Sequence, residues 1–166
     1  MKPLYAFAVV ATLSACATQP VEQQPSTARS ETCKFTTSQE IAALFDHWNQ
    51  SLATGDPKKV VANYANPSIL LATLSNKPRF TPEEKEEYFQ HFMANGPSGR
   101  IDMRHIETGC NTAIDAGLYT FTFAKTGRKV SARYSFTYYW DGKAWLITSH
   151  HSSMMPEKNQ SGRKAL

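Results

Sequence analysis

Arg133, His150 and His151 are the polar residues of this sequence whose type and position could do chemistry. Arg133 falls in the middle of an alternating run over residues 130–138. A guanidinium held there could bind a carboxylate through two parallel hydrogen bonds. The alternative is that Arg133 points outward as a solvated cross-strand residue. His150 and His151 are neighbours on a predicted strand, so their rings point to opposite faces and only one can face the interior.

The inward histidine has two interpretations. It is either structural, with its ring hydrogen-bonded to Ser152 or Ser153, or it lines a pocket and takes part in acid–base chemistry near neutral pH. Because the two rings point apart, we expect no metal site. The sequence also has no glycine-rich nucleotide loop and no kinase catalytic-loop string, so we expect no cofactor and no kinase activity.

Three further residues are candidates for a pocket. Arg79 suits either the mouth of a pocket or a surface loop, and Tyr64 suits either the mouth or the core. Trp48 fits a packed core better than a cofactor site, although it too could line a pocket.

A cofactor-free enzyme that works by general acid–base catalysis would need a buried carboxylate or a histidine–aspartate pair with shifted pKa values. Most acidic residues here mark helix caps and helix surfaces, and the strands contribute Asp102, Glu107 and Asp115 without an evident histidine partner. Asp46, beside His47, is the best remaining base. We therefore favour a binding module over an enzyme.

The elements that must position these residues begin with three helices. Their starts are marked by Thr37-x-x-Glu40, Asp56-Pro57 and Thr81-Pro82-Glu83-Glu84, and their ends by Gly55, Asn66-Pro67 and Gly96-Pro97. Strands are expected at 69–72, at 100–114 with a bulge at Gly109, and at 117–124, 130–138 and 144–151. Helices followed by a mostly antiparallel sheet indicate the α+β class.

The two ends of the chain carry signals of another kind. Residues 1–15 combine Lys2 with an apolar run that is too short to span a bilayer, which is typical of a cleaved signal peptide. Leu13-Ser14-Ala15-Cys16 resembles the lipobox of bacterial lipoproteins, in which the cysteine is acylated; an ordinary cut after Ala17 is the alternative. We expect an exported, outer-membrane lipoprotein that faces the periplasm, with a lipidated start and flexible tether at 16–32, a domain at 33–156 and a flexible tail at 157–166.

The charge of the chain bears on its partners, and its cysteine content bears on disulfide formation. The formal charge is +4, but the basic residues form no run or stripe, so we expect no nucleic-acid partner. If Cys16 carries lipid, Cys33 and Cys110 remain as an even pair in an oxidising compartment. They form either a disulfide or two separate buried thiols.

Several local strings resemble the nuclear transport factor 2-like superfamily, and within it the association domain of calcium/calmodulin-dependent protein kinase II. The strings are Phe45-x-x-Trp48-Asn49, Leu52-Ala53-Thr54-Gly55-Asp56-Pro57, Tyr88-Phe89-x-x-Phe92, Ala132-Arg133-Tyr134, Asp141-Gly142-Lys143-x-Trp145 and His150-His151-Ser152-Ser153-Met154-Met155-Pro156-Glu157. The SnoaL-like polyketide cyclases belong to the same superfamily.

This resemblance implies a cone in which a curved antiparallel sheet wraps over the three helices. It implies homodimers or larger rings, and a pocket for a small, acidic molecule lined near Arg133 by arginine and histidine. The alternative that it leaves open is a cofactor-free isomerase, dehydratase or cyclase.

Overall fold

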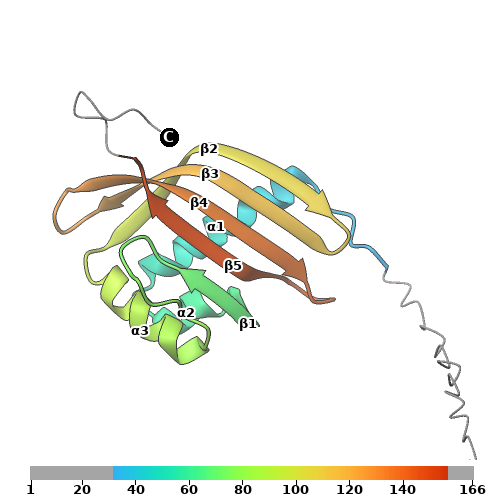
Figure 1. Ribbon diagram of the computed structural model, residues 1–166, viewed down its shortest axis with the longest axis horizontal. Helices are drawn as coiled ribbons and strands as arrows, with labels where there is room; N and C mark the ends of the chain where they lie inside the picture. Colours follow the sequence, from blue (N-terminus) through green and yellow to red (C-terminus); the bar gives the residue numbers. More distant parts are fainter. Residues whose placement is uncertain (1–31, 157–166) are drawn as a thin grey trace, which may run out of the picture. The chain divides into compact units, whose positions relative to one another are not determined.

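A computed structural model describes residues 32–156, and Figure 1 shows its helices and strands. The helices are α1 (Ser38–Ala53), α2 (Pro57–Val61) and α3 (Pro82–Met93). The strands are β1 (Tyr64–Leu71), β2 (Pro97–Gly109), β3 (Thr112–Phe123), β4 (Lys129–Trp140) and β5 (Trp145–Met154). They form one sheet in the order β1-β5-β4-β3-β2, in which β1 runs parallel to β5 and the other pairs are antiparallel. The predicted α+β class is confirmed.

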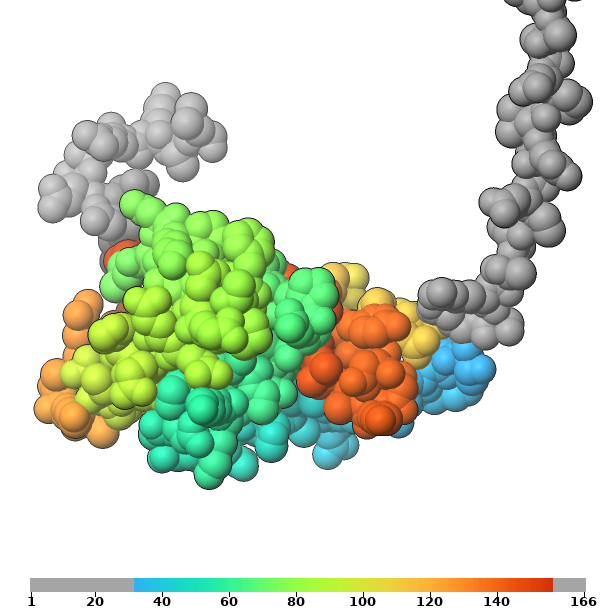
Figure 2. All heavy atoms as spheres, turned by 90° about the horizontal axis from the view of Figure 1, so that it is seen from below, coloured from blue at the N-terminus to red at the C-terminus, as the bar shows by residue number. Residues whose placement is uncertain are grey.

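The helices cover one face of the sheet, which we call the inner face. Helix α1 crosses behind the strands in Figure 1 and packs mainly against β2 and β3, whereas α2 and α3 contact each other. On the side of the molecule seen in Figure 2, α2 (teal) and α3 (green) form a layer next to the end of the sheet. The opposite, outer face of the sheet is not covered by any helix of the described residues.

Capping residues fix where the helices start. Thr37 accepts a hydrogen bond from the Glu40 amide at the start of α1, and Asp56 accepts one from the Lys58 amide at the start of α2. Thr81 and Glu84 form a complete capping box at α3. At α1 the box is incomplete, because the Glu40 carboxylate instead accepts a hydrogen bond from Thr36.

The strand expected over residues 100–114 is interrupted. The chain reverses at Cys110 and Asn111, so that β2 and β3 form a long hairpin. Asn111 adopts a left-handed φ of 56°, which asparagine tolerates in tight turns. The sheet irregularity lies between Ile101 and Met103 rather than at Gly109. A Cβ on Gly117, which opposes this point, would lie only 2.0 Å from the Met103 carbonyl oxygen, so glycine is required there.

Aromatic side chains fill most of the space between α1 and the inner face. The ring of Phe45 lies 6.2 Å from that of Phe136 and 6.3 Å from that of Tyr134. Trp48 packs edge-on against Phe136 at 5.5 Å. These four residues are at most 3% exposed, and burial of each large side chain contributes roughly 2–3 kcal/mol to folding.

An ion pair is buried beside this aromatic core. Asp115 has no exposed surface; its Oδ2 lies 3.0 Å from Nη2 of Arg104, and its Oδ1 accepts a 2.7 Å hydrogen bond from the Tyr134 hydroxyl. Burial raises the pKa of Asp115, while Tyr134 and Arg104 act in the opposite direction. The three groups thus link β2, β3 and β4 beside the core.

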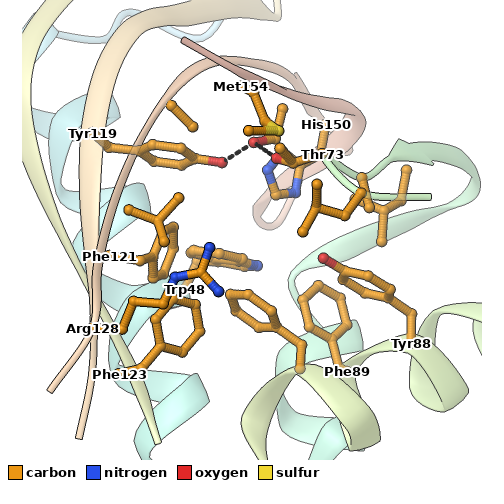
Figure 3. A pocket seen from close by; sticks show the side chains of 17 residues that line it. Trp48, Thr73, Tyr88, Phe89, Tyr119, Phe121, Phe123, Arg128, His150 and Met154 are labelled. Atoms are coloured by element: carbon orange, nitrogen blue, oxygen red, sulfur yellow. Dashed lines mark hydrogen bonds between the residues drawn. The ribbon is translucent and has the colours of Figure 1, made fainter. Parts of the chain in front are cut away.

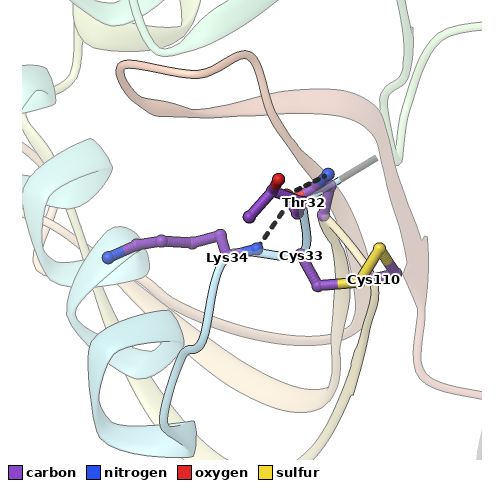
Figure 4. Close-up of a disulfide and its surroundings, with 5 residues drawn as sticks. Thr32, Cys33, Lys34 and Cys110 are labelled. Atoms are coloured by element: carbon purple, nitrogen blue, oxygen red, sulfur yellow. Dashed lines mark hydrogen bonds between the residues drawn. A yellow bond between two sulfur atoms is a disulfide. The ribbon is translucent and has the colours of Figure 1, made fainter. Parts of the chain in front are cut away.

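The predicted disulfide between Cys33 and Cys110 is confirmed, with the two Cα atoms 4.8 Å apart (Figure 4). Asn111 reinforces the link, because its side chain accepts a hydrogen bond from the Lys34 amide and donates one to the Thr32 carbonyl. The residues before α1 are thereby attached to the tip of the β2–β3 hairpin.

Candidate functional site

A cavity of about 220 Å³ lies between α1, α3, the loop after β1 and the inner faces of β3, β4 and β5 (Figure 3). Most of its wall is apolar: Trp48, Leu70, Ala72, Leu74, Phe89, Phe92, Phe121, Phe123, Val130, Ala132 and Met154. Its polar lining residues are Thr73, Tyr88, Tyr119, Arg128, His150 and Ser152. An apolar hollow with few polar groups is the usual form of a small-molecule site.

Three hydroxyl groups meet on one wall of the cavity, and we call them the hydroxyl cluster: Thr73, Tyr119 and Ser152. The Ser152 oxygen accepts a hydrogen bond from the Tyr119 hydroxyl and shares another with Thr73 Oγ1 (Figure 3). The three residues come from the loop after β1, from β3 and from β5. Burial raises the pKa of Tyr119, so this phenol stays protonated and can donate.

His150 lies beside the hydroxyl cluster and is 4% exposed. Its ring stacks on Phe136 at 4.1 Å, and its Nδ1 lies 2.8 Å from the hydroxyl oxygen of Tyr64. Burial, together with the nearby His151, lowers the pKa of His150 to about 3, so the ring is neutral at physiological pH.

The tautomer of His150 follows from its partner. Burial raises the pKa of Tyr64 well above its usual value, so the phenol keeps its proton. Within residues 32–156 that proton has no acceptor other than His150. We therefore assign Tyr64 as the donor to Nδ1, which leaves the ring proton on Nε2. This Nε2 is buried and has no hydrogen-bond partner in the described part of the chain.

The charge of the cavity comes from arginine. Arg128 lies at the turn before β4, and its guanidinium points toward the cavity in Figure 3. No aspartate or glutamate of the described residues lines this cavity. The hydroxyl, imidazole and guanidinium groups that do line it can all donate hydrogen bonds, so the cavity suits a ligand that accepts them.

The prediction that Arg133 lines the cavity is wrong, and of the two adjacent histidines it is His150 that faces inward. Arg133 and His151 lie away from the cavity. Both lie exposed on the outer face, where Arg133 Nε donates a 3.2 Å hydrogen bond to Ser153. The reason is strand alternation: Ala132 and Tyr134 point inward, so Arg133 between them points outward.

The other predicted pocket residues are distributed around the cavity. Trp48 and His150 lie on its wall, and Tyr64 lies behind His150. Arg79 contacts the cavity only indirectly, because its guanidinium stacks 4.8 Å from the ring centre of Tyr88 and lines a shallower depression beyond that ring. Whether any of them binds a ligand stays a prediction.

No carboxylate–histidine pair faces the cavity within residues 32–156. The His105 and Glu107 side chains lie 3.0 Å apart, but both are exposed on β2. Asp46 and His47, the best base candidates in the sequence, are exposed on α1. In the described residues, no three His, Cys, Asp or Glu side chains are grouped so that they could hold a metal ion.

The predicted signal peptide, the lipidation site Cys16 and the tail at 157–166 lie outside the described residues. Within the described part, no helix has the length and hydropathy needed to cross a membrane.

Sequence reasoning missed Arg128, Thr73, Tyr88 and Tyr119 as cavity residues. A signal for Arg128 was present, because it continues the even-numbered series of β4 whose members Val130 and Ala132 face inward. No comparable signal marked Thr73, which lies in a loop with no periodicity.

The curved sheet over three helices, with a hollow at one end, defines the class of the protein as nuclear transport factor 2-like. Within that class, the family model of the calcium/calmodulin-dependent protein kinase II association domain matches residues 37–156. The chain belongs to this family, as the sequence resemblance predicts. No curated protein matches the chain significantly.

Solved structures support this assignment. An association domain of this kind from Xanthomonas campestris is 46% identical, with a TM-score of 0.68 over 76% of this chain and 97% of that one. An NTF2-like protein from Pseudomonas putida KT2440 is 15% identical, with a TM-score of 0.64 over 81% and 96%. A cyanobacterial iota-carbonic anhydrase in complex with bicarbonate is 19% identical, with a TM-score of 0.66 over 74% and 94%. The last two likenesses concern the fold alone.

Proposed function

We propose that this association domain binds a small anion with carboxylate-type oxygens, such as bicarbonate or a short carboxylate, in the cavity. The observation that carries the proposal is the set of hydrogen-bond donors on its wall: the hydroxyl cluster, neutral His150 and Arg128, with no acidic side chain among the described lining residues. An anionic oxygen would accept from these donors, and Arg128 would offset its charge.

The size of the cavity limits the ligand. Sites for drug-sized molecules usually enclose about 300–1,000 Å³, whereas this cavity holds about 220 Å³. Eleven apolar side chains surround the polar wall and would exclude water from a bound ligand. We therefore expect an anion of few heavy atoms rather than a nucleotide or a sugar phosphate.

Binding is tested by titrating the purified domain with bicarbonate and with acetate, followed by calorimetry and by NMR. Ser152→Ala removes the central hydroxyl of the cluster and should weaken binding by about tenfold. Ser153→Ala is the matched control, since Ser153 lies on the outer face of the same strand and should leave the affinity unchanged. Equal affinities in all three proteins would contradict the proposed site.

A second candidate function is the interconversion of carbon dioxide and bicarbonate. Two features favour it: the shared fold with a carbonic anhydrase that was crystallised with bicarbonate, and a cavity that joins an apolar wall to hydroxyl groups. Water would add its oxygen to the carbon of carbon dioxide to give bicarbonate and one proton, which passes to the buffer, while Ser152 and Thr73 hydrogen-bond the oxygens of the product. Stopped-flow hydration assays with a pH indicator test this activity, and a rate no higher than that of the buffer would exclude it.

We also propose that the domain self-associates through the outer face of the sheet. The family is defined as an association domain, and this face carries the exposed apolar side chains Ile114 and Tyr139. Light scattering of the purified protein should give a dimer or a larger ring. A monomer at micromolar concentration would contradict self-association.

Export and lipid anchoring at Cys16 are proposals that rest on the sequence of residues 1–17. The disulfide is compatible with an oxidising compartment. Mass spectrometry of the mature N-terminus tests both steps, since an acylated Cys16 is expected. An unmodified Cys16 or a start at Thr18 would exclude the anchor.

A further inference from the structure

Tyr88 is placed between two hollows. Its ring lines the main cavity on one side and a shallower surface depression on the other. In Figure 3 its hydroxyl points into the main cavity from α3, opposite the wall that carries the hydroxyl cluster. Within residues 32–156 this hydroxyl makes no hydrogen bond to a protein group, so it is available to a ligand.

Arg79 supports the Tyr88 ring from the far side. Its guanidinium carbon lies 4.8 Å from the centre of that ring, which is within the range of a cation–π contact. The same guanidinium is held by the loop, because its Nη1 donates to Ser75 Oγ at 2.8 Å and to the Lys77 carbonyl at 2.6 Å. These contacts fix the orientation of the Arg79 guanidinium, which packs against the face of the Tyr88 ring.

The backbone of Arg79 is fixed as well. Its amide and carbonyl exchange hydrogen bonds of 3.0 and 2.9 Å with Leu70 of β1, which itself lines the cavity. The Phe92 ring also stacks with the Tyr88 ring; the two ring centres are 5.8 Å apart and the ring planes differ by 13°. The ring is thus confined between α3 and the loop before it.

We propose that Arg79 is a positioning residue, which holds the Tyr88 hydroxyl toward the anion bound in the cavity. This inference rests on the proposed anion site and assigns Tyr88 as a further hydroxyl donor beside the hydroxyl cluster. Arg79 would act in two ways: it fixes the ring, and its charge favours the loss of electron density from the phenol oxygen, which makes the hydroxyl a better donor. Burial raises the pKa of Tyr88 to about 12, so the hydroxyl stays protonated although Arg79 acts in the opposite direction.

A double-mutant cycle with bicarbonate tests the coupling. Arg79→Gln should weaken bicarbonate binding by about fivefold to tenfold in the wild-type background, and by less than about twofold when Tyr88→Phe has already removed the hydroxyl. Arg79→Lys should rescue little, because an ammonium group lacks the planar face that stacks on the ring. Arg100→Gln is the matched control, since it removes a surface arginine that pairs with Asp102 away from both hollows, and it should keep the affinity within about twofold.

A measurement without ligand separates this inference from the proposed function. With 3-fluorotyrosine placed at position 88, the fluorine resonance should be narrow and shifted in wild type, and Arg79→Gln should move it toward the position of the free amino acid. If bicarbonate fails to bind wild type, the proposed function fails and the fluorine spectrum still decides the positioning role. The positioning role is overturned if bicarbonate binds but Arg79→Gln lowers the affinity by the same factor in wild type and in Tyr88→Phe, and also leaves the fluorine resonance unchanged.

Discussion

The hydroxyl of Tyr64 lies 2.8 Å from Nδ1 of His150; both residues are buried, with His150 on the cavity wall and Tyr64 behind it. Burial keeps the imidazole neutral, and the contact with Tyr64 fixes its orientation between Phe136 and Trp48. Because the ring stays neutral at physiological pH, it acts as a hydrogen-bond donor through Nε2 and not as an acid or base that titrates.

The neutral state of His150 predicts a pH dependence of stability. Its pKa is about 3 in the folded protein and about 6.5 when unfolded, so the unfolded chain binds more protons between these values. The stabilisation is therefore complete above pH 6.5 and is lost as the pH falls toward 3, by up to about 1.4 kcal/mol per pH unit. Urea denaturation at pH 7 and at pH 5 should show this slope in wild type and in His151→Gln. The slope should be absent in His150→Gln, and a persisting slope there would contradict the assignment.

Replacing Arg128, in the turn before β4, and Arg133, in β4, should have different effects on bicarbonate binding. Arg128 points toward the cavity, whereas Arg133 lies on the outer face. Arg128→Gln should weaken bicarbonate binding about threefold to tenfold and reduce its dependence on salt, because a screened attraction is lost. Arg133→Gln is the matched control. Calorimetry at two salt concentrations measures both variants, and a larger effect at Arg133 would place the ligand elsewhere.

The disulfide predicts a loss of stability without a loss of binding. Cys33 and Cys110 are 77 residues apart, and a loop of this length contributes roughly 4 kcal/mol in the chain-entropy model. The bond lies at the hairpin tip, at the opposite end of β3 from the cavity residues Phe121 and Phe123. Replacing both cysteines by serine should therefore lower the free energy of unfolding by a few kcal/mol and leave the bicarbonate affinity unchanged. Denaturation with and without reductant measures the first effect, and unchanged stability would show that the unfolded chain is not restrained by this bond.

The buried ion pair predicts a large cost for a single deletion. Asp115→Ala leaves Arg104 and the Tyr134 hydroxyl without their shared partner, which should destabilise the domain by about 3–5 kcal/mol. Asp102→Ala is the control, since that carboxylate pairs with Arg100 at the surface and should cost less than about 1 kcal/mol. Similar melting temperatures for the two variants would contradict a structural role for Asp115.

Local sequence rules predicted most of the helices and strands, but they misplaced the β2–β3 turn and the end of α2, which Asn66-Pro67 was expected to mark and which lies at Val61, and they were insufficient for the site. Thr81 and Glu84 predicted the start of α3, because capping interactions form within one helical turn. The alternation over residues 130–138 correctly predicted which side chains share each face of β4. The same alternation already placed Arg133 opposite Ala132 and Tyr134; the error was to let the resemblance to the family decide its direction. Charge in mid-strand was not, by itself, a sign of burial.

The hydroxyl cluster could not be predicted, because its members are distant in the sequence. Thr73 and Ser152 come together only because β1 pairs in parallel with β5, a register that depends on the whole sheet. The position of the β2–β3 turn was missed for a related reason. Asn111 sits between two strand-like segments, and its left-handed backbone is fixed by contacts with Lys34 and Thr32.

The central claim is that a small anion binds between Ser152 and Arg128. The most direct measurement is a crystal structure of the domain soaked in bicarbonate, with acetate as a second ligand. We expect planar density within hydrogen-bonding distance of Ser152 Oγ, inside the cavity and on the side that Arg128 faces. A cavity that contains only water at saturating bicarbonate, or an anion bound solely on the outer face beside Arg133, would contradict the claim.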